Sequence, residues 1–180
     1  DPHKCSREFI DFFSFVALPQ MPEFWVEYDR GTLTYDEVKS RLCAYKGCDE
    51  ALCEANMQTA IGMQEEIPST KRLIERLKTA GYRLYVLSNM SREFIAWLRH
   101  FPVYGNFDGE VVSCEEGTVK PEDEIYRLLL TRYHIDPSQT LFIDDRRANL
   151  DAASRFGIAT FLFDHRNPEA SCMELERMLL

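Results

Sequence analysis

The chain has 180 residues, of which 45% are hydrophobic and 28% are charged, and its formal net charge is −9. This composition is ordinary for a globular protein with one domain, or with a core and a smaller companion domain. The acidic balance makes a nucleic-acid backbone an unsuitable partner. The 180 residues contain neither an apolar run long enough to cross a bilayer nor a signal-peptide pattern, so we expect no membrane partner.

The first third of the chain is predicted to be helical and acidic. Residues 1–66 contain 6 Lys/Arg against 13 Asp/Glu, a net charge of −7. Thr34 is a suitable N-cap for a helix, because Glu37 occupies the capping-box position. No strand is predicted before residue 67. Helical patterns cover three segments, residues 1–17, 35–42 and 49–62.

The second part, residues 67–180, alternates predicted strands with predicted helices. Ser69 or Thr70 is expected to cap the first of these helices, which Gly81 ends. Strands are predicted at residues 83–88, 110–113, 140–144 and 159–163. Further helices are predicted at residues 91–100, 122–133 and 146–156 and from about residue 168. This alternation predicts an α/β fold with a parallel, doubly wound sheet.

The carboxyl ends of two predicted strands carry residues suited to chemistry. Ser88 and Asn89 follow one strand, and Asp144 and Asp145 follow another. The strand ends of an open parallel sheet share one crevice, so these side chains are expected to lie close together. Lys120 lies in a glycine-containing loop whose Pro121 is expected at the first position of a helix.

The adjacent carboxylates of Asp144 and Asp145 favour a bound cation. Two like charges side by side are unfavourable unless a positive group joins them, and Mg²⁺ prefers carboxylate oxygens. The alternative is that one aspartate caps the following helix and the other is solvated. A hydroxyl at Ser88, backbone N–H groups, the ammonium of Lys120 and a carboxylate-bound metal together form a phosphate-binding set. Their joint placement favours a phosphate site over isolated helix caps and surface charges.

The three motifs resemble those of the haloacid dehalogenase-like hydrolases, which are mostly phosphatases. Residues 84–89 resemble the second motif, whose Ser/Thr binds phosphate, and residues 119–121 resemble the third, whose lysine neutralises charge. Residues 142–145, with Asn149, resemble the fourth motif, the acidic magnesium site. The resemblance implies an α/β core over residues 67–180 and a small all-helical cap over residues 1–66.

The resemblance also implies the reaction and the role of each residue. It implies a Mg²⁺-dependent phosphomonoesterase that acts on a small phosphorylated metabolite through an aspartyl-phosphate intermediate. Ser88 and Asn89 would bind phosphate, and Lys120 would bind it and neutralise charge. Asp145 and Asp144 would hold the metal, with Asn149 in support. Residues 28–37 are similar to a cap segment of the subgroup that includes bacterial sugar phosphatases acting on glucose 1-phosphate.

One motif of the family, the Asp-x-Asp that carries the nucleophile and the acid/base, does not occur in the 180 residues. Asp29 precedes a similar tail, but no apolar strand leads into it, and Asp11 lies inside a helical pattern. Residues 1–5 resemble the segment just after this motif. We therefore expect that the sequence begins beyond the first core strand. The 180 residues alone are then expected to fold poorly and to be inactive, because neighbouring strands lose their partner.

Two alternatives to the phosphatase remain at this point. A non-catalytic binding module that keeps the phosphate pocket would explain the absent nucleophile. A 2-haloacid dehalogenase needs no metal, and the paired aspartates disfavour it. The sequence specifies neither the substrate nor the oligomeric state.

The six cysteines lack the paired CxxC spacing of a zinc site. Cys43, Cys48 and Cys53 are each five residues apart, which does not stack them on one helical face. Without a secretory signal, we expect reduced, mostly buried thiols in a cytoplasmic protein.

Overall fold

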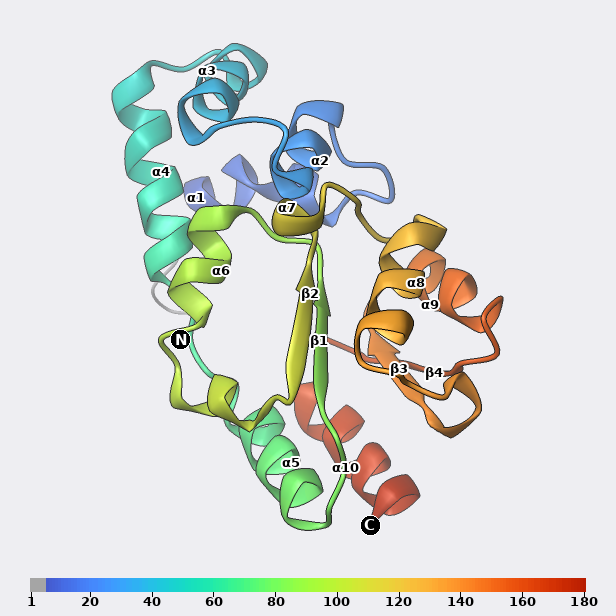
Figure 1. The fold of residues 1–180 in the computed structure, drawn as a ribbon. Helices are drawn as coiled ribbons and strands as arrows, with labels where there is room; N and C mark the ends of the chain where they lie inside the picture. The colour runs from blue at the N-terminus through green and yellow to red at the C-terminus, as the bar shows by residue number, and fades with distance from the viewer. Residues whose placement is uncertain (1–5) are drawn as a thin grey trace.

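A computed structural model describes residues 6–180, and its first part is entirely helical (Figure 1). Thr34 and Glu37 form the predicted capping box at the start of α3, and Asp49 caps α4 by accepting a hydrogen bond from the backbone N–H of Leu52. The predicted helix over residues 49–62 is therefore confirmed. The helical elements are α1 (Arg7–Phe12), η1 (Ser14–Ala17), α2 (Glu23–Arg30), α3 (Tyr35–Lys46) and α4 (Glu50–Gly62).

The helix expected over residues 1–17 is broken into α1 and the 3-10 helix η1. Ser6 caps α1, since its side chain accepts a hydrogen bond from the N–H of Phe9. Phe15 of η1 packs with Trp25 and Leu42 in the core of the helical part. Residues 1–5, which resemble the segment after the family's first motif, lie outside the described residues.

The second part contains short strands between helices, as the alternation predicts. Its strands are β1 (Tyr85–Ser88), β2 (Gly109–Val112), β3 (Leu141–Asp144) and β4 (Ala159–Leu162). Its helices are α5 (Pro68–Thr79), α6 (Arg92–Leu98), η2 (Pro102–Asn106), α7 (Ser113–Glu116), α8 (Asp123–Arg132), η3 (Pro137–Gln139), α9 (Arg147–Ser154) and α10 (Pro168–Leu179). An α/β fold with parallel strands is therefore confirmed.

The strands form two parallel pairs rather than the single sheet that the pattern predicts. β1 pairs with β2 so that Ser88 lies opposite Val112, and β3 pairs with β4 so that Asp144 lies opposite Leu162. Among residues 6–180, no strand pairing joins β1 to β3. The ends that carry Ser88 and Asp144 therefore belong to separate pairs.

Helices cover the strands on more than one side (Figure 1). α5 and α10 lie side by side and share a core that includes Leu73 and Leu175, against which strand residues such as Phe161 pack. α8 and α9 bury Ile125 and Ala152 against Val111 of β2. Within the described part of the chain, no helix is both long and apolar enough to span a membrane.

Two local predictions are wrong. α5 begins at Pro68 after the N-cap Ile67, so neither Ser69 nor Thr70 caps it; a proline suits the first helical turn, where its missing N–H costs nothing. Pro121 does not open α8, which begins at Asp123. The Glu122 carboxylate instead accepts hydrogen bonds from the Thr118 hydroxyl and the Val119 N–H, and these bonds turn the chain before the helix starts.

Candidate active site

A buried ion pair lies between the ends of β1 and β3. The ammonium of Lys120 is 2.7 Å from Oδ2 of Asp144, and the two side chains are 11% and 5% exposed. The same ammonium donates a hydrogen bond of 2.8 Å to the carbonyl of Leu87 in β1 and lies 5.6 Å from the ring centroid of Phe142 in β3. A buried pair of charges requires such additional partners, and here they fix the position of Lys120.

The second oxygen of Asp144 is held by the start of α9. Its Oδ1 accepts hydrogen bonds from the backbone N–H of Arg146 at 2.8 Å and from Nδ2 of Asn149 at 2.9 Å. Asn149 is itself buried, and its carbonyl accepts a hydrogen bond from the hydroxyl of Tyr126. The strand-to-helix turn thus orients Asp144 toward Lys120 and away from solvent.

Asn89 connects the end of β1 to the loop that carries Lys120. Its Nδ2 donates to the carbonyl of Lys120 at 2.9 Å, and its Oδ1 accepts from the N–H of Lys120 at 2.7 Å. Ser88 is the half-buried last residue of β1, next to Asn89. The structure therefore brings Ser88, Asn89, Lys120, Asp144 and Asn149 into one region at the strand ends.

Asp145 differs from Asp144 in being exposed. Its side chain is 48% exposed, and its Oδ2 lies 3.4 Å from Nδ1 of His165. A carboxylate offers about four acceptor positions, and Asp144 already uses three of its own for Lys120, Arg146 and Asn149. A hard cation such as Mg²⁺ fits the donor chemistry at Asp145, with at most one remaining acceptor position on Asp144.

Asp29 lies at the end of α2 and also faces this region, although the sequence around it does not identify it as a site residue. Burial raises the pKa of Asp29 to about 7, while the positive charges of Arg146 and Lys120 act in the opposite direction. Asp29 lies in the last turn of α2, which agrees with the expectation that no apolar strand leads into it. Its placement depends on the packing of α2 against the second part of the chain, which no local sequence signal specifies.

Contacts at Asp29, Arg30 and Gly31 help to hold the end of α2 against the second part of the chain. The Ser113 hydroxyl donates to the Asp29 carbonyl at 2.5 Å. Both guanidinium NH₂ groups of Arg30 donate to the Glu122 carboxylate, at 2.8 and 2.6 Å. Gly31 follows with φ of 80°, and a Cβ at this position would lie 2.3 Å from the carbonyl oxygen of Cys114. Only glycine allows so close an approach in this left-handed conformation.

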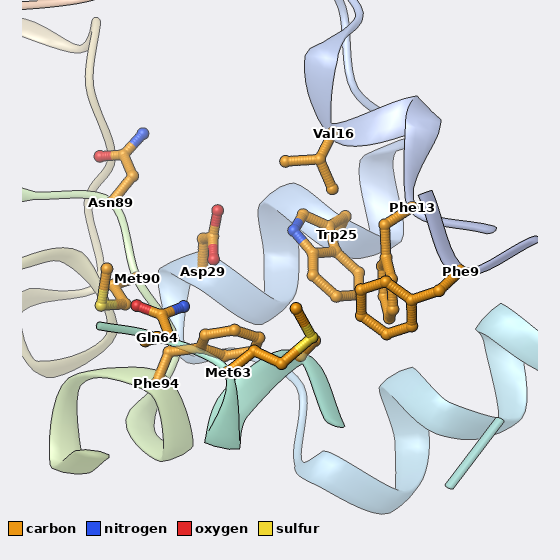
Figure 2. A pocket seen from close by; sticks show the side chains of 11 residues that line it. Phe9, Phe13, Val16, Trp25, Asp29, Met63, Gln64, Asn89, Met90 and Phe94 are labelled. Carbon is orange, nitrogen blue, oxygen red and sulfur yellow. The ribbon is translucent and has the colours of Figure 1, made fainter. Parts of the chain in front are cut away.

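A cavity of about 470 Å³ lies between the helices of the first part and the loop after β1 (Figure 2). Asn89 and Asp29 face it on one side, and Phe9 and Phe13 line the opposite end. The cavity therefore extends from the region of the strand ends toward the aromatic side chains of the helical part. Its remaining lining residues are Val16, Trp25, Ala60, Met63, Gln64, Met90 and Phe94.

The fold and the strand-end residues agree with a comparison against family models. Residues 16–157 match the model of the haloacid dehalogenase-like hydrolases. The chain therefore belongs to this family of hydrolases.

Relatives with named activities include phosphatases. The chain is 28% identical to the sesquiterpene phosphatase astK of Aspergillus oryzae, over 87% of this chain and 80% of the relative. It is 28% identical to the D-ribitol-5-phosphate phosphatase of Bacteroides thetaiotaomicron, over 75% and 68%. It is also 29% identical to acyl-CoA dehydrogenase family member 10 of Mus musculus, over 86% of this chain but only 15% of that protein.

Solved structures show the same fold. A predicted HAD-like family hydrolase from Porphyromonas gingivalis is 26% identical, with a TM-score of 0.74 over 97% of this chain and 90% of that one. A HAD family enzyme from Bacteroides thetaiotaomicron, in complex with magnesium and inorganic phosphate, is 26% identical, with a TM-score of 0.68 over 88% and 87%.

Proposed function

We propose that the protein is a Mg²⁺-dependent phosphatase that hydrolyses the phosphate monoester of a small metabolite in the cytoplasm. The observation that carries this proposal is the buried Lys120–Asp144 pair beside the exposed carboxylate of Asp145. Phosphoryl transfer needs positioning and charge neutralisation more than covalent chemistry, and a fixed lysine with a metal site supplies both. Relatives named as phosphatases, and a similar structure that holds magnesium and phosphate, support it.

Each site residue has a proposed role. Ser88 and the backbone at Asn89 bind the phosphate, and Lys120 neutralises its charge. Asp145 ligates the metal directly, and Asp144 contributes a second oxygen while holding Lys120. When bound, Mg²⁺ neutralises the charge that develops on the phosphoryl oxygens. We also propose that residues 1–66 are the cap that selects the substrate and residues 67–180 the core.

The nucleophile is proposed to come from outside the 180 residues, which contain no Asp-x-Asp. A strand between β1 and β3 would complete the sheet and place its carboxyl end beside Lys120. An aspartate there would attack phosphorus, so that an aspartyl O–P bond forms as the ester P–O bond breaks, and the second aspartate of the Asp-x-Asp motif would protonate the leaving alcohol. Water would then lose a proton to that carboxylate and attack phosphorus, the aspartyl O–P bond would break, and inorganic phosphate would leave. The unpaired edges of β1 and β3 among the described residues support such a strand.

The test uses the full chain that the reading frame encodes, assayed on p-nitrophenyl phosphate with and without Mg²⁺. We expect Mg²⁺-dependent turnover that Asp145→Ala lowers by about 100-fold or more. Asp151→Ala is the matched control, because Asp151 is an exposed aspartate on α9, and this variant should keep wild-type turnover. Phosphate binding without turnover of any monoester would instead establish a binding module.

A further inference from the structure

The cavity beside the proposed phosphate site is mostly apolar. Eight of its eleven lining residues are aromatic or aliphatic. A cavity of about 470 Å³ is within the usual range for small-ligand sites. Its aromatic and sulfur-containing side chains come both from the helical part, as Trp25 and Met63 do, and from the segment after β1, as Met90 and Phe94 do.

The three polar side chains of the cavity offer few hydrogen bonds to a ligand. Both polar atoms of the Asn89 side chain already bond to the backbone of Lys120. Gln64 and Asp29 remain (Figure 2). Burial raises the pKa of Asp29 to about 7, so near neutral pH a large share of molecules carries an uncharged carboxyl. A sugar or polyol chain would bury several hydroxyl groups here without partners, which opposes binding.

The cavity and the proposed phosphate site share Asn89. Asn89 lines the cavity and fixes the backbone of Lys120, so a phosphate held at Lys120 would direct its ester group past Asn89 into the cavity. We propose that the substrate is the phosphate monoester of an apolar alcohol, with a hydrocarbon or aromatic group lying between Phe9, Trp25 and Phe94. This inference rests on the proposed phosphatase function and narrows its substrate class.

The decisive experiment measures kcat/KM of the full encoded chain on ethyl, butyl, hexyl and octyl phosphate, with D-ribitol 5-phosphate and glucose 1-phosphate alongside. Burial of each added methylene should raise kcat/KM about threefold to fourfold. Both polyol phosphates should fall below hexyl phosphate. A flat series, or a polyol phosphate that exceeds hexyl phosphate, would overturn the inference and leave the phosphatase intact. No turnover of any monoester would overturn the phosphatase, and the inference with it.

A pair of variants locates the apolar contact. Phe9→Gln introduces a polar group into the cavity wall and should lower the octyl-to-ethyl ratio of kcat/KM about tenfold. Ile10→Gln is the matched control, because Ile10 is the neighbouring residue, is 56% exposed and does not line the cavity. Met63→Gln repeats the test from α4's C-cap. An unchanged ratio in both Phe9→Gln and Met63→Gln would place the hydrocarbon elsewhere.

A separate observation concerns the thiols of Cys43, Cys48 and Cys53. Their Sγ atoms all lie within 4.8 Å of one another, and those of Cys48 and Cys53 are 3.5 Å apart. Cys43 lies on α3 and Cys53 on α4, so helix packing gathers residues that sequence spacing would separate. An ion bonded tetrahedrally to thiolates at about 2.3 Å holds them roughly 3.8 Å apart, which agrees with this cluster.

We infer that the three cysteines form a site for a thiophilic divalent ion such as Zn²⁺. Thiolates favour such ions over Mg²⁺, so this site would not compete with the one at Asp145. Cys53 is fully buried and Cys48 is partly exposed, so an ion would enter past Cys48, where solvent can supply a fourth ligand.

Titration with Co²⁺ under reducing conditions tests this site through its thiolate-to-metal charge-transfer absorption. We expect one ion per chain, displaced by Zn²⁺, and at least tenfold weaker uptake in Cys48→Ser. Cys172→Ser should bind as the wild type does, because Cys172 is a buried cysteine on α10 outside the cluster. The inference fails if no charge-transfer band develops, or if Cys48→Ser and the wild type take up Co²⁺ equally.

Discussion

The two sides of the candidate site are built differently. On the strand-end side, Lys120, Asp144 and Asn149 are buried, and their hydrogen bonds hold one another in place. On the side of the helical part, the walls are apolar, and Asp29 is a single carboxyl among aromatic and aliphatic neighbours. Saturated polar networks fix one geometry, whereas apolar contacts tolerate many shapes of ligand.

This difference suggests a division of labour within the proposed phosphatase. The strand ends would bind the phosphate group of every substrate in the same way. The cavity wall would determine specificity for the group that is esterified to the phosphate. Changes on the two sides should then differ in kind. Strand-end variants should affect all substrates equally, and wall variants should affect them selectively.

The largest expected effect is that of Lys120→Met. It should lower kcat/KM by about 10²- to 10³-fold for every monoester alike. It should also destabilise the fold by about 3–5 kcal/mol, because Asp144 is left as a buried charge without its partner. Measuring kcat/KM and urea unfolding together checks both effects. A loss of kcat/KM on one monoester but not on the others would contradict the proposed difference between the strand ends and the cavity wall.

A second variant separates activity from stability. Lys120→Met combined with Asp144→Asn removes the unpaired charge and should recover much of the lost stability while activity stays low. Lys78→Met is the surface control. Its ion pair with Asp108 is partly exposed and should contribute no more than about 1 kcal/mol.

The strand-end side is also the part that the sequence predicts well. An apolar run followed by Asp144, and another followed by Ser88, predict that these residues lie at the carboxyl ends of parallel strands. Local sequence spacing is enough to predict these positions, because the carboxyl ends of parallel strands lie at the same edge whatever the conformation of the loops. The capping box of Thr34 and Glu37 is equally local, and the structure confirms it.

The cavity wall and the cysteine cluster could not be predicted in this way. Asp29 and Phe94 line the same cavity because α2 packs against the second part of the chain, and Cys43 lies near Cys53 because α3 packs on α4. These residues come together through tertiary packing, and no helix or strand periodicity in the sequence relates them. The separation of β1 from β3 agrees with the expectation that the strand between them is missing, and the side chain of Lys120 lies between their ends.

Substitution of Gly31 measures how much the close approach of α2 to the second part of the chain contributes to stability. Gly31→Ala should destabilise the fold by about 1–3 kcal/mol more than Gly47→Ala, measured by urea unfolding. Both residues have positive φ, so alanine brings similar backbone strain at each. Only at Gly31 would the new Cβ meet backbone, 2.3 Å from the Cys114 carbonyl. Equal losses of unfolding free energy in the two variants would mean that the backbone at Gly31 does not pack closely against Cys114.

Asp29 should make stability depend on pH. Its folded pKa of about 7 lies above the unfolded value of about 3.9, so the folded state holds the proton more tightly. Stability should therefore fall as pH rises from about 4 to 7 and then level off. Asp29→Asn should flatten this decline and be more stable than the wild type at pH 8, but not at pH 4. Parallel pH profiles of the two proteins would argue against a raised pKa at Asp29.

The smallest expected effect belongs to the Arg30–Glu122 pair, which links the end of α2 to the loop after Lys120. Its hydrogen bonds to Arg30 lower the pKa of Glu122 to about 2, below an unfolded value of about 4.3. The stabilisation is therefore complete above about pH 4.3 and is lost as pH falls toward 2.

Because Glu122 is 43% exposed, solvent screens the pair, and Arg30→Gln should cost no more than about 1 kcal/mol. Thermal unfolding at low and high salt measures this, and the difference from the wild type should shrink as salt rises. A loss of several kcal/mol that does not depend on salt would mean that this contact, rather than the approach at Gly31, positions the cavity wall over the strand ends.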